Sequence, residues 1–311
     1  MKKILYNKFG DVSVMEMADT ATPTVTDTTL LVKVKAVSIN PLDWKIREGQ
    51  MKMMSGSTFP KGIGIDFSGV IEKVGAAVKS FHIGDAVFGL VDVFKGGALA
   101  EYIVVSESDI ALKPPAISFE QAATLAVTGS AALQILAKLN LSPSKNVLIN
   151  GATGGIGMYL TQFVKQQGAH VTSVTSERLV SFAEEWKSDV VFSYEKQNVL
   201  KSGRKYDVVI DLSGRLPFAS ARQIMKDRAD YVNTTPGPKE IIGAAVNNLF
   251  SSKKYHVLLL KQSANHLASI AERIEGIDIV VGKTFLFTAF QEAYQQVPLE
   301  KFAGKAVITL P

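Results

Sequence analysis

The fold is decided by residues 147–157, which read Val147-Leu148-Ile149-Asn150-Gly151-Ala152-Thr153-Gly154-Gly155-Ile156-Gly157. A short apolar run leads into a glycine-rich turn, and a stretch with helical periodicity continues through residue 165. A strand, a glycine turn and a helix in this order present the unpaired N–H groups of the helix N-terminus to an anion. The stretch therefore predicts a phosphate-binding turn inside an α/β domain.

The glycines of this turn have separate expected roles. Gly154 lets the backbone approach a pyrophosphate, and Gly157 lets the helix pack closely on the strand. Ala152 takes the place of the first glycine of the G-x-G-x-x-G pattern. The residues expected to contact a dinucleotide are Ala152, Thr153, Gly154, Gly155, Ile156 and Gly157. The alternative is a tight strand–helix turn that binds nothing.

Strand-like and helical segments alternate around the turn. Strands are predicted at residues 147–150, 170–175, 190–194, 206–212, 229–233 and 255–260, with helical stretches between most of them. The end of the chain is predicted to hold a helix at 264–275, a strand at 277–281, a helix at 288–296 and a strand at 305–310. Repeated strand–helix units imply a parallel sheet covered on both faces.

The first ~115 residues have a different pattern, of short strands punctuated by glycine. Strands are expected at 30–37, 66–75, 85–89 and 98–105, which suits an all-β barrel-like unit. The composition changes at residues 113–115, Lys-Pro-Pro. Ser118 and Gln121 then form a capping box, and a helix is expected over 122–139.

The end of the second strand of the parallel sheet indicates which dinucleotide binds. An acidic residue there would hold a ribose 2′-hydroxyl and repel a 2′-phosphate. Here Ser176 offers a hydroxyl and Arg178 a planar charged fork, on either side of Glu177. Tyr194, after the third strand, can stack on adenosine or donate to the phosphate. These residues predict NADP(H), although residues 176–178 could instead only cap a helix.

Composition excludes several other classes of protein. The chain has 311 residues, 47% of them hydrophobic and 20% charged, which is globular and long enough for two domains. No cysteine is present, which excludes disulfides, thiolate metal sites and cysteine nucleophiles. The net charge of +5 is scattered, so no nucleic-acid partner is expected. Neither a signal peptide nor an 18-residue apolar run occurs, so we expect a cytoplasmic protein without a membrane partner.

Several motifs, taken together and in order, resemble the medium-chain dehydrogenase/reductase superfamily in its zinc-independent quinone oxidoreductase branch. These motifs lie at residues 40–49, 64–75, 81–89, 96–102, 151–157, 207–214 and 304–308 and cover nearly the whole chain. The resemblance implies a GroES-like β-barrel catalytic domain at 1–118 and a Rossmann NADP-binding domain with a doubly wound parallel sheet at 119–262. A C-terminal segment at 263–311 would complete the catalytic domain.

The resemblance also implies that no metal is bound. Zinc-dependent members place a cysteine at or near Asn40 and a His-Glu pair where this chain has Ile65 and Asp66. A catalytic zinc needs about three protein ligands, and the histidines of this chain are scattered. Without a Lewis acid, quinones and conjugated enones become the better hydride acceptors, because the developing charge delocalises to a remote oxygen.

The resemblance places Asn40, Asp43 and Lys45 at the nicotinamide end of the site. Asn40 and Lys45 are the catalytic candidates, the first as a donor to a carbonyl and the second as a partner of an enolate or of the cofactor. Asp43 would orient Lys45 or accept from a ribose hydroxyl. Alternatively, Asn40 and Lys45 are ordinary turn residues.

Further cofactor contacts are expected from Thr128, by resemblance, and from Leu212, Ser213 and Asn233, which follow or end strands of the sheet. Thr128 could instead bond back to the preceding turn of its helix. Lys305 matches a recurrent lysine of the family, and the sequence assigns it no role.

The sequence predicts an NADPH-dependent oxidoreductase that transfers hydride to a small-molecule quinone or α,β-unsaturated carbonyl. The alternatives are a 2-enal or enoyl-thioester reductase, or a non-catalytic NADPH-binding protein. The apolar strand at 255–260 is expected at a sheet edge, where pairing with a second copy would give a homodimer.

Overall fold

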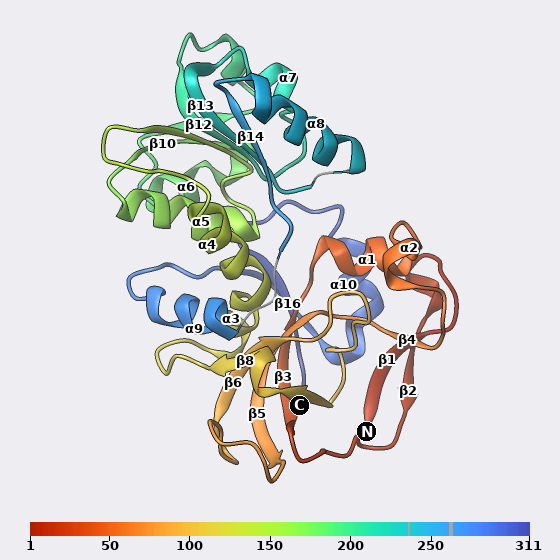
Figure 1. The fold of residues 1–311 in the computed structure, drawn as a ribbon. Coiled ribbons are helices and arrows are strands. Elements are labelled where there is room, and N and C mark those ends of the chain that lie inside the picture. Colours follow the sequence, from red (N-terminus) through yellow and green to blue (C-terminus); the bar gives the residue numbers. More distant parts are fainter. Residues whose placement is uncertain (236, 261–263) are drawn as a thin grey trace.

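The computed structural model describes residues 1–235, 237–260 and 264–311, and it confirms the predicted α/β class. Figure 1 shows a mainly β domain, which carries both marked chain ends, and an α/β domain formed by the middle of the chain. The chain crosses from the β domain to the α/β domain once and returns near its end. The site therefore has to be sought where these two parts meet.

The first domain is built from two sheets. The larger has the order β15-β16-β3-β5-β6-β8, with β7 also paired to β3, and the smaller has the order β2-β1-β4. Their bounds are β1 Lys2–Tyr6, β2 Met15–Asp19, β3 Thr29–Ser38, β4 Lys61–Gly62, β5 Asp66–Val74, β6 Ala86–Leu90, β7 Tyr102–Ser106, β8 Ile110–Leu112, β15 Val281–Leu286 and β16 Lys305–Thr309. Short helices α1 (Pro41–Arg47), α2 (Lys52–Ser55) and α10 (Phe290–Gln296) accompany them.

The last strand of the chain lies in the middle of this domain. β16 pairs antiparallel with β3, with Val307 opposite Ser38, and parallel with β15. Ile308 of β16 is fully buried in the same hydrophobic cluster as Phe67 of β5 and Ile4 of β1. The end of the chain is thus held by the core of the first domain. The predicted domain limits at 118 and 262 stay predictions.

The second domain contains a parallel sheet with the order β11-β10-β9-β12-β13-β14. The bounds are β9 Asn146–Asn150, β10 His170–Thr175, β11 Val190–Ser193, β12 Tyr206–Asp211, β13 Met225–Asn233 and β14 Lys254–Val257. In chain order this is the 3-2-1-4-5-6 arrangement of a doubly wound sheet. The order reverses between β9 and β12, and the carboxyl ends of those strands are where such sheets bind ligands.

Side chains alternate between the two faces of this sheet. Val147 and Ile149 of β9 join one buried cluster, and Leu148 between them joins another. The first face is covered by α4 (Ser130–Leu136), α5 (Gly155–Gln166) and α9 (Ala264–Arg273), and the second by α7 (Phe218–Ala221) and α8 (Pro238–Phe250). The remaining helices are α3 (Phe119–Ala123) and α6 (Val180–Glu185). Both faces are covered, as predicted from the strand–helix repeats.

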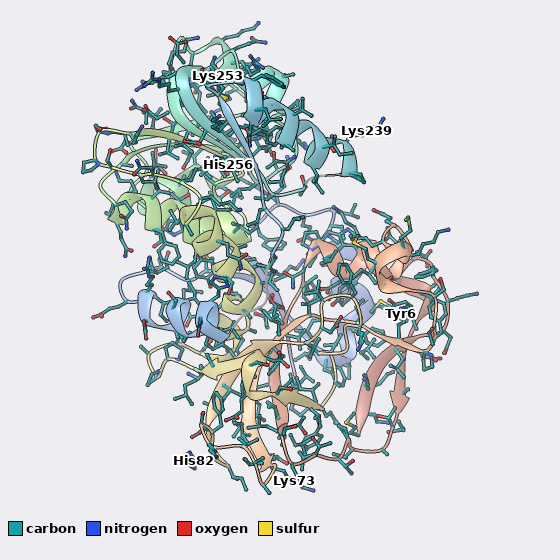
Figure 2. The ribbon with its side chains drawn as sticks, viewed as in Figure 1. Tyr6, Lys73, His82, Lys239, Lys253 and His256 are labelled. Atoms are coloured by element: carbon teal, nitrogen blue, oxygen red, sulfur yellow. The ribbon has the colours of Figure 1, made fainter. Side chains whose placement is uncertain are left out.

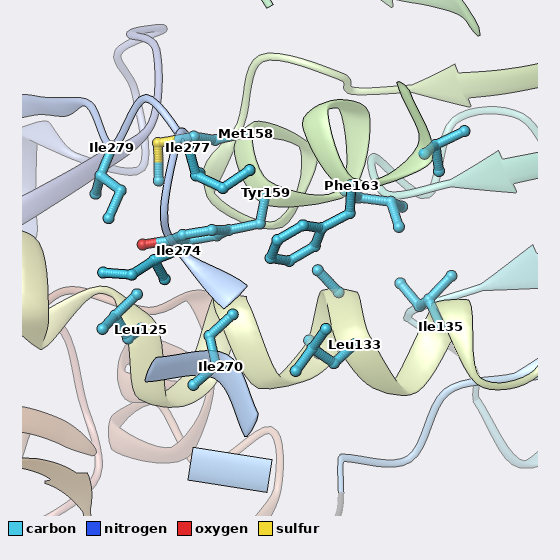
Figure 3. Close-up of a cluster of buried hydrophobic side chains, with 14 of the residues drawn as sticks. Leu125, Leu133, Ile135, Met158, Tyr159, Phe163, Ile270, Ile274, Ile277 and Ile279 are labelled. Carbon is cyan, nitrogen blue, oxygen red and sulfur yellow. The ribbon is translucent and has the colours of Figure 1, made fainter. Parts of the chain in front are cut away.

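The first cluster ties distant parts of the chain together. Figure 3 shows Tyr159 and Phe163 of α5 above Leu133 of α4, with Ile270 of α9 nearby. All four side chains are less than a tenth exposed. The helix that begins at the glycine turn is therefore held rigidly by packing along its length.

Some predicted elements were wrong. The strand expected at 277–281 begins only at Val281, because the backbone of Asp278 pairs with the side-chain amide of Gln162 instead of with a strand. The helix expected at 122–139 divides into α3, a π-helical segment Leu125–Gly129 and α4. The strand expected at 98–105 starts at Tyr102, and α8 was not predicted at all. Within the described residues, no helix is long and apolar enough to cross a membrane.

Candidate functional site

The glycine turn joins β9 to α5 at the point where the strand order reverses. Gly151 has φ +86°, a left-handed conformation that favours glycine. A Cβ on Gly157 would lie 2.4 Å from the carbonyl oxygen of Ala152, so this position tolerates no side chain. A Cβ on Gly154 would meet, among the described residues, only the Gly151 oxygen at 3.6 Å. Gly157 thus serves packing, and Gly154 leaves open space at the helix N-terminus.

The turn touches the first domain directly. The backbone N–H of Gly304 donates to the carbonyl oxygen of Thr153 at 2.9 Å. A Cβ on Gly155 would lie 2.5 Å from Cδ of Lys305 and 3.1 Å from the methyl carbon of Thr128. The Thr128 hydroxyl donates to the Thr124 carbonyl at 2.6 Å, which is the alternative considered from the sequence. Thr128 nevertheless lies against the first turn of α5, as its predicted role requires.

Lys305 connects the turn to Asn40. Its buried ammonium group donates to Oδ1 of Asn40 and to the carbonyl oxygen of Ile39, each at 2.6 Å. The Asn40 amide nitrogen donates to Asp66 at 3.0 Å and to the Ser38 carbonyl at 3.4 Å. Both ends of the Asn40 amide are therefore occupied by protein groups. The predicted donation from Asn40 to a substrate carbonyl would have to displace one of them.

Asp43 is 4% exposed and lies at the start of α1. Its Oδ2 accepts from the backbone N–H of Asn40 at 2.8 Å and from the hydroxyl of Tyr294 at 3.2 Å. Its Oδ1 is buried without a hydrogen-bond partner in the described part of the chain. Burial, reinforced by the negative charge of Asp66, raises the pKa of Asp43 to about 7.

Lys45 does not contact Asp43 as predicted. It is half-buried on α1, and its ammonium group forms no hydrogen bond or ion pair with the described residues. The partners of Asp43 are Asn40 and Tyr294 instead. Nothing in the sequence around Asp43 points to Tyr294, because this residue comes from α10, about 250 residues later.

The residues predicted to contact the adenosine end of the cofactor lie around the carboxyl ends of β10 and β11. The hydroxyl of Ser176 is buried and, among the described residues, has no hydrogen-bond partner. Arg178 is exposed two residues further on, and Tyr194 is 45% exposed after β11. The ammonium of Lys301 lies 4.9 Å from the centre of the Tyr194 ring, a cation–π contact. Sequence reasoning missed Lys301, which comes from the returning C-terminal segment.

Glu177 would oppose a 2′-phosphate if its charge were free. Its carboxylate pairs with Lys196, and its backbone N–H donates to Glu195 at 2.9 Å. The pairing lowers the pKa of Glu177, so the carboxylate stays ionised and its charge is met by Lys196. Arg178 is then left as a cation beside the unpartnered Ser176 hydroxyl.

The remaining predicted contacts surround the same turn. A Cβ on Gly151 would lie 3.4 Å from Cβ of Leu212 and 3.5 Å from the backbone nitrogen of Ser213. The amide of Asn150 donates to the Ser213 hydroxyl at 2.8 Å. The Asn233 side chain is used inside the sheet, where it donates to the Tyr255 hydroxyl at 3.0 Å. Leu212 and Ser213 thus adjoin the turn, and Asn233 connects β13 to β14.

Comparison with known proteins shows which proteins this chain resembles. Residues 26–115 match the model of the alcohol dehydrogenase GroES-like domain, and residues 186–308 match that of a zinc-binding dehydrogenase. The chain is 31% identical to the chloroplastic quinone oxidoreductase QR1 of Triphysaria versicolor, over 99% of this chain and 98% of that protein. It is 34% identical to the NADPH-dependent alkenal/one oxidoreductase of Arabidopsis thaliana, over 69% of this chain and 58% of that protein.

A solved structure agrees with these matches. The quinone oxidoreductase from Coxiella burnetii has a TM-score of 0.92 and 27% identity, and the similarity covers 100% of this chain and 99% of that one. The chain therefore belongs to the medium-chain dehydrogenase/reductase superfamily, in its quinone oxidoreductase-like branch. It is an oxidoreductase of the kind that uses a nicotinamide cofactor, and it has a GroES-like and a Rossmann domain.

Proposed function

We propose that this protein reduces quinones or α,β-unsaturated carbonyls with NADPH and without zinc. One observation carries the choice of NADPH, namely the buried hydroxyl of Ser176, which has no hydrogen-bond partner within residues 1–235, 237–260 and 264–311, with Arg178 two residues further along the chain. A 2′-phosphate would fill the vacant hydrogen bond of Ser176 and pair with the Arg178 guanidinium. Glu177, which would repel a phosphate, is already paired with Lys196.

The residues around Asn40 do not fit a zinc site. A zinc ion would compete with the Lys305 ammonium, which already occupies Oδ1 of Asn40. Ile65 offers no ligand atom. Figure 2 shows His82 at the far end of the β domain from His256, which lies in the other domain, 2.6 Å from Asp230. Among the described residues, no three His, Cys, Asp or Glu side chains are placed to hold a metal.

A site that has an ammonium and hydrogen-bond donors in place of a metal favours a particular class of substrate. When bound, the nicotinamide supplies the hydride, and the protein has to position and stabilise the charge that develops. A fixed ammonium and hydrogen-bond donors can stabilise a charge that is spread over a conjugated system. The names of the relatives, quinone oxidoreductase and alkenal/one oxidoreductase, support the same class. The proposed compartment is the cytoplasm, although these relatives are chloroplastic.

A screen of NADPH oxidation tests the proposal. The purified chain is given quinones, enones, 2-enals and enoyl thioesters, each with NADPH and with NADH. We expect turnover with at least one quinone or enone and a clear preference for NADPH. Faster turnover of 2-enals or enoyl thioesters than of quinones and enones would show that the enzyme belongs to that other substrate class. Tight binding of NADPH without oxidation by any of these acceptors would contradict an enzymatic role.

A further inference from the structure

Three charged side chains are buried together between the glycine turn and α1. Asp43, Asp66 and Lys305 come from α1, β5 and β16, and none is more than 5% exposed. Tyr294 of α10 completes the group through its hydrogen bond to Asp43. We call these four residues the acid–lysine cluster. The nicotinamide chemistry described above does not account for its two carboxyl groups.

The number of charges in the cluster implies a bound proton. Burial lowers the pKa of Lys305, and the charges of Asp66 and Asp43 oppose that shift. Its two hydrogen bonds at 2.6 Å, to Ile39 and Asn40, both need a donor, so we count it as an ammonium with one positive charge. Two ionised carboxylates would leave a net negative charge in an environment with almost no water. An uncompensated buried charge is far more costly than a buried neutral carboxyl. One proton shared between Asp43 and Asp66 makes the cluster neutral.

Burial raises the pKa of both Asp43 and Asp66, so the hydrogen bonds have to indicate which carboxyl holds that proton. Both oxygens of Asp66 lie 2.8 Å from the Ser38 hydroxyl, and Oδ1 also accepts from Asn40. Asp43 accepts two hydrogen bonds at Oδ2, while its buried Oδ1 accepts none from the described residues. A bare ionised oxygen is the least favourable state for such an atom, so Oδ1 of Asp43 is the natural place for the proton.

We propose that Asp43 holds a proton at Oδ1 in the resting protein and supplies it during reduction of the substrate. The second half of this inference rests on the proposed function. The cluster adjoins the cofactor turn, because Lys305 packs on Gly155 and bonds Asn40, the residue that precedes α1.

The step balances in atoms and charge. Reduction of an enone or quinone adds a hydride and a proton, and the hydride brings both electrons. The O–H bond of Asp43 breaks as the reduced substrate forms its new bond to hydrogen. Asp43 is left as a carboxylate, stabilised by Lys305 and by the Tyr294 hydroxyl. A proton from water then restores the carboxyl before the next turnover.

The surroundings set the direction of the pH effect. Asp43 faces Asp66 of β5, Lys305 of β16 and Tyr294 of α10, with Arg47 of its own helix and Tyr6 of β1 nearby. Arg47 is paired with Glu48 at 2.9 Å. Burial raises the pKa of Asp43 to about 7, so the proton is present below that pH and is lost as the pH rises through it. Turnover limited by this proton should therefore fall on the alkaline side.

Infrared spectroscopy of the cofactor-free protein tests the resting state. The carbonyl stretch of a protonated carboxyl is distinct from the bands of a carboxylate, and ¹³C-aspartate labelling assigns it to aspartate. We expect one such band below neutral pH, its loss as the pH rises through about 7, and its absence in Asp43→Asn. Either Asp→Asn change makes the cluster neutral without a proton, so the assignment uses variants that keep both carboxyls. Tyr294→Phe removes a hydrogen bond of Asp43, and the matched Ser38→Ala removes the hydroxyl bonded to Asp66. We expect the pH at which the band is lost to rise in Tyr294→Phe and to change less in Ser38→Ala, and circular dichroism checks that each variant is folded.

Several outcomes would overturn the assignment. Absence of a protonated aspartate band from the unmodified protein at pH 6 would mean that both carboxyls are ionised, and this result needs no variant. A band that changes in folded Ser38→Ala and stays the same in folded Tyr294→Phe would move the proton to Asp66. Either result leaves the proposed reductase activity untouched, since neither measurement uses NADPH or a substrate.

The pH profile of kcat tests the catalytic half. We expect an alkaline decline approaching about tenfold per pH unit in the unmodified enzyme and its loss in Asp43→Asn. Tyr294→Phe should shift the decline to higher pH, because the hydroxyl stabilises the ionised carboxylate. An unchanged profile in folded Asp43→Asn would show that the proton comes from elsewhere, even if the infrared band is confirmed.

Discussion

Ser176 and Arg178, the two residues expected to bind a 2′-phosphate, differ in their exposure to solvent. Ser176 is buried with an unsatisfied hydroxyl, which is costly unless a ligand pairs with it. Arg178 is exposed on the single 3₁₀ turn Glu177–Leu179 that follows β10. A hydroxyl and a cation two residues apart at one strand end are groups that can both bind a phosphate. Their separate contributions can be measured.

Arg178→Ala should weaken binding of NADPH by about tenfold or more and leave NADH unchanged. The reason is the loss of one charge-assisted contact, worth roughly 1.5–3 kcal/mol. Dissociation constants from the quenching of protein fluorescence would show it. Arg204→Ala is the matched control, because this exposed arginine precedes β12 at the opposite end of the sheet. Equal affinity of the unmodified chain for both cofactors would contradict the assignment.

At the scale of elements, the turn between β9 and α5 assigns packing and ligand approach to different glycines. Gly157→Ala should lower the free energy of unfolding by about 1–3 kcal/mol, because the new Cβ meets the Ala152 oxygen at 2.4 Å. Gly154→Ala should leave stability nearly unchanged, since this Cβ has room, and should weaken NADPH binding. Urea unfolding and cofactor titration on both variants would separate the two roles. If Gly154→Ala lost stability and Gly157→Ala did not, the roles assigned to the two glycines would have to be exchanged.

The elements that the sequence predicted well are those whose signal is local. The strands of the parallel sheet and the turn at 151–157 have apolar runs and glycines in their own sequence, and β10 was located to the residue. The stretch at 277–280 was wrong because its backbone pairs with the distant Gln162. Helix α8 was missed although Pro238 at its first position and Glu240 in its first turn are local start signals. Lys301 and Tyr294 reach the site from the end of the chain. The sequence pattern around Tyr194 and Asp43 therefore could not predict that Lys301 and Tyr294 contact them.

At the scale of the whole molecule, β14 lies at the edge of its sheet within the described residues. Exposed apolar side chains gather beside it, on α8 and after the strand, and include Ile242, Leu249, Phe250 and Leu259. Figure 2 shows Lys253 and His256 on this same part of the domain. A second copy could cover the apolar side chains and pair the free strand edge. We therefore propose a homodimer.

Leu259→Glu should break this dimer without unfolding the domain, since Leu259 is exposed, whereas Leu258→Glu should unfold it, since Leu258 is buried in the core. Sedimentation at micromolar concentration would report the mass, and circular dichroism the fold. A species of only 33.6 kDa from the unmodified chain would refute the dimer.

Removal of metal from the purified protein tests whether its activity and stability depend on zinc. Dialysis against a strong chelator should leave the activity and the melting temperature unchanged, because Lys305 already occupies the Asn40 oxygen. Elemental analysis before and after dialysis gives the zinc content. Stoichiometric zinc in the purified protein, with activity lost on its removal and regained on its return, would overturn the zinc-free proposal.

The position of β16 inside the first domain has a consequence for synthesis on the ribosome. The strands of the parallel sheet, residues 146–257, are all translated before β16 at 305–309, which pairs with β3 at 29–38. The second domain can therefore close its sheet while the first still lacks a central strand, although domains usually mature in the order of their sequence. Until Lys305 emerges, the Asp66 carboxylate lacks the cation beside it and Oδ1 of Asn40 lacks its donor, so the amino-terminal domain is the later of the two to become native.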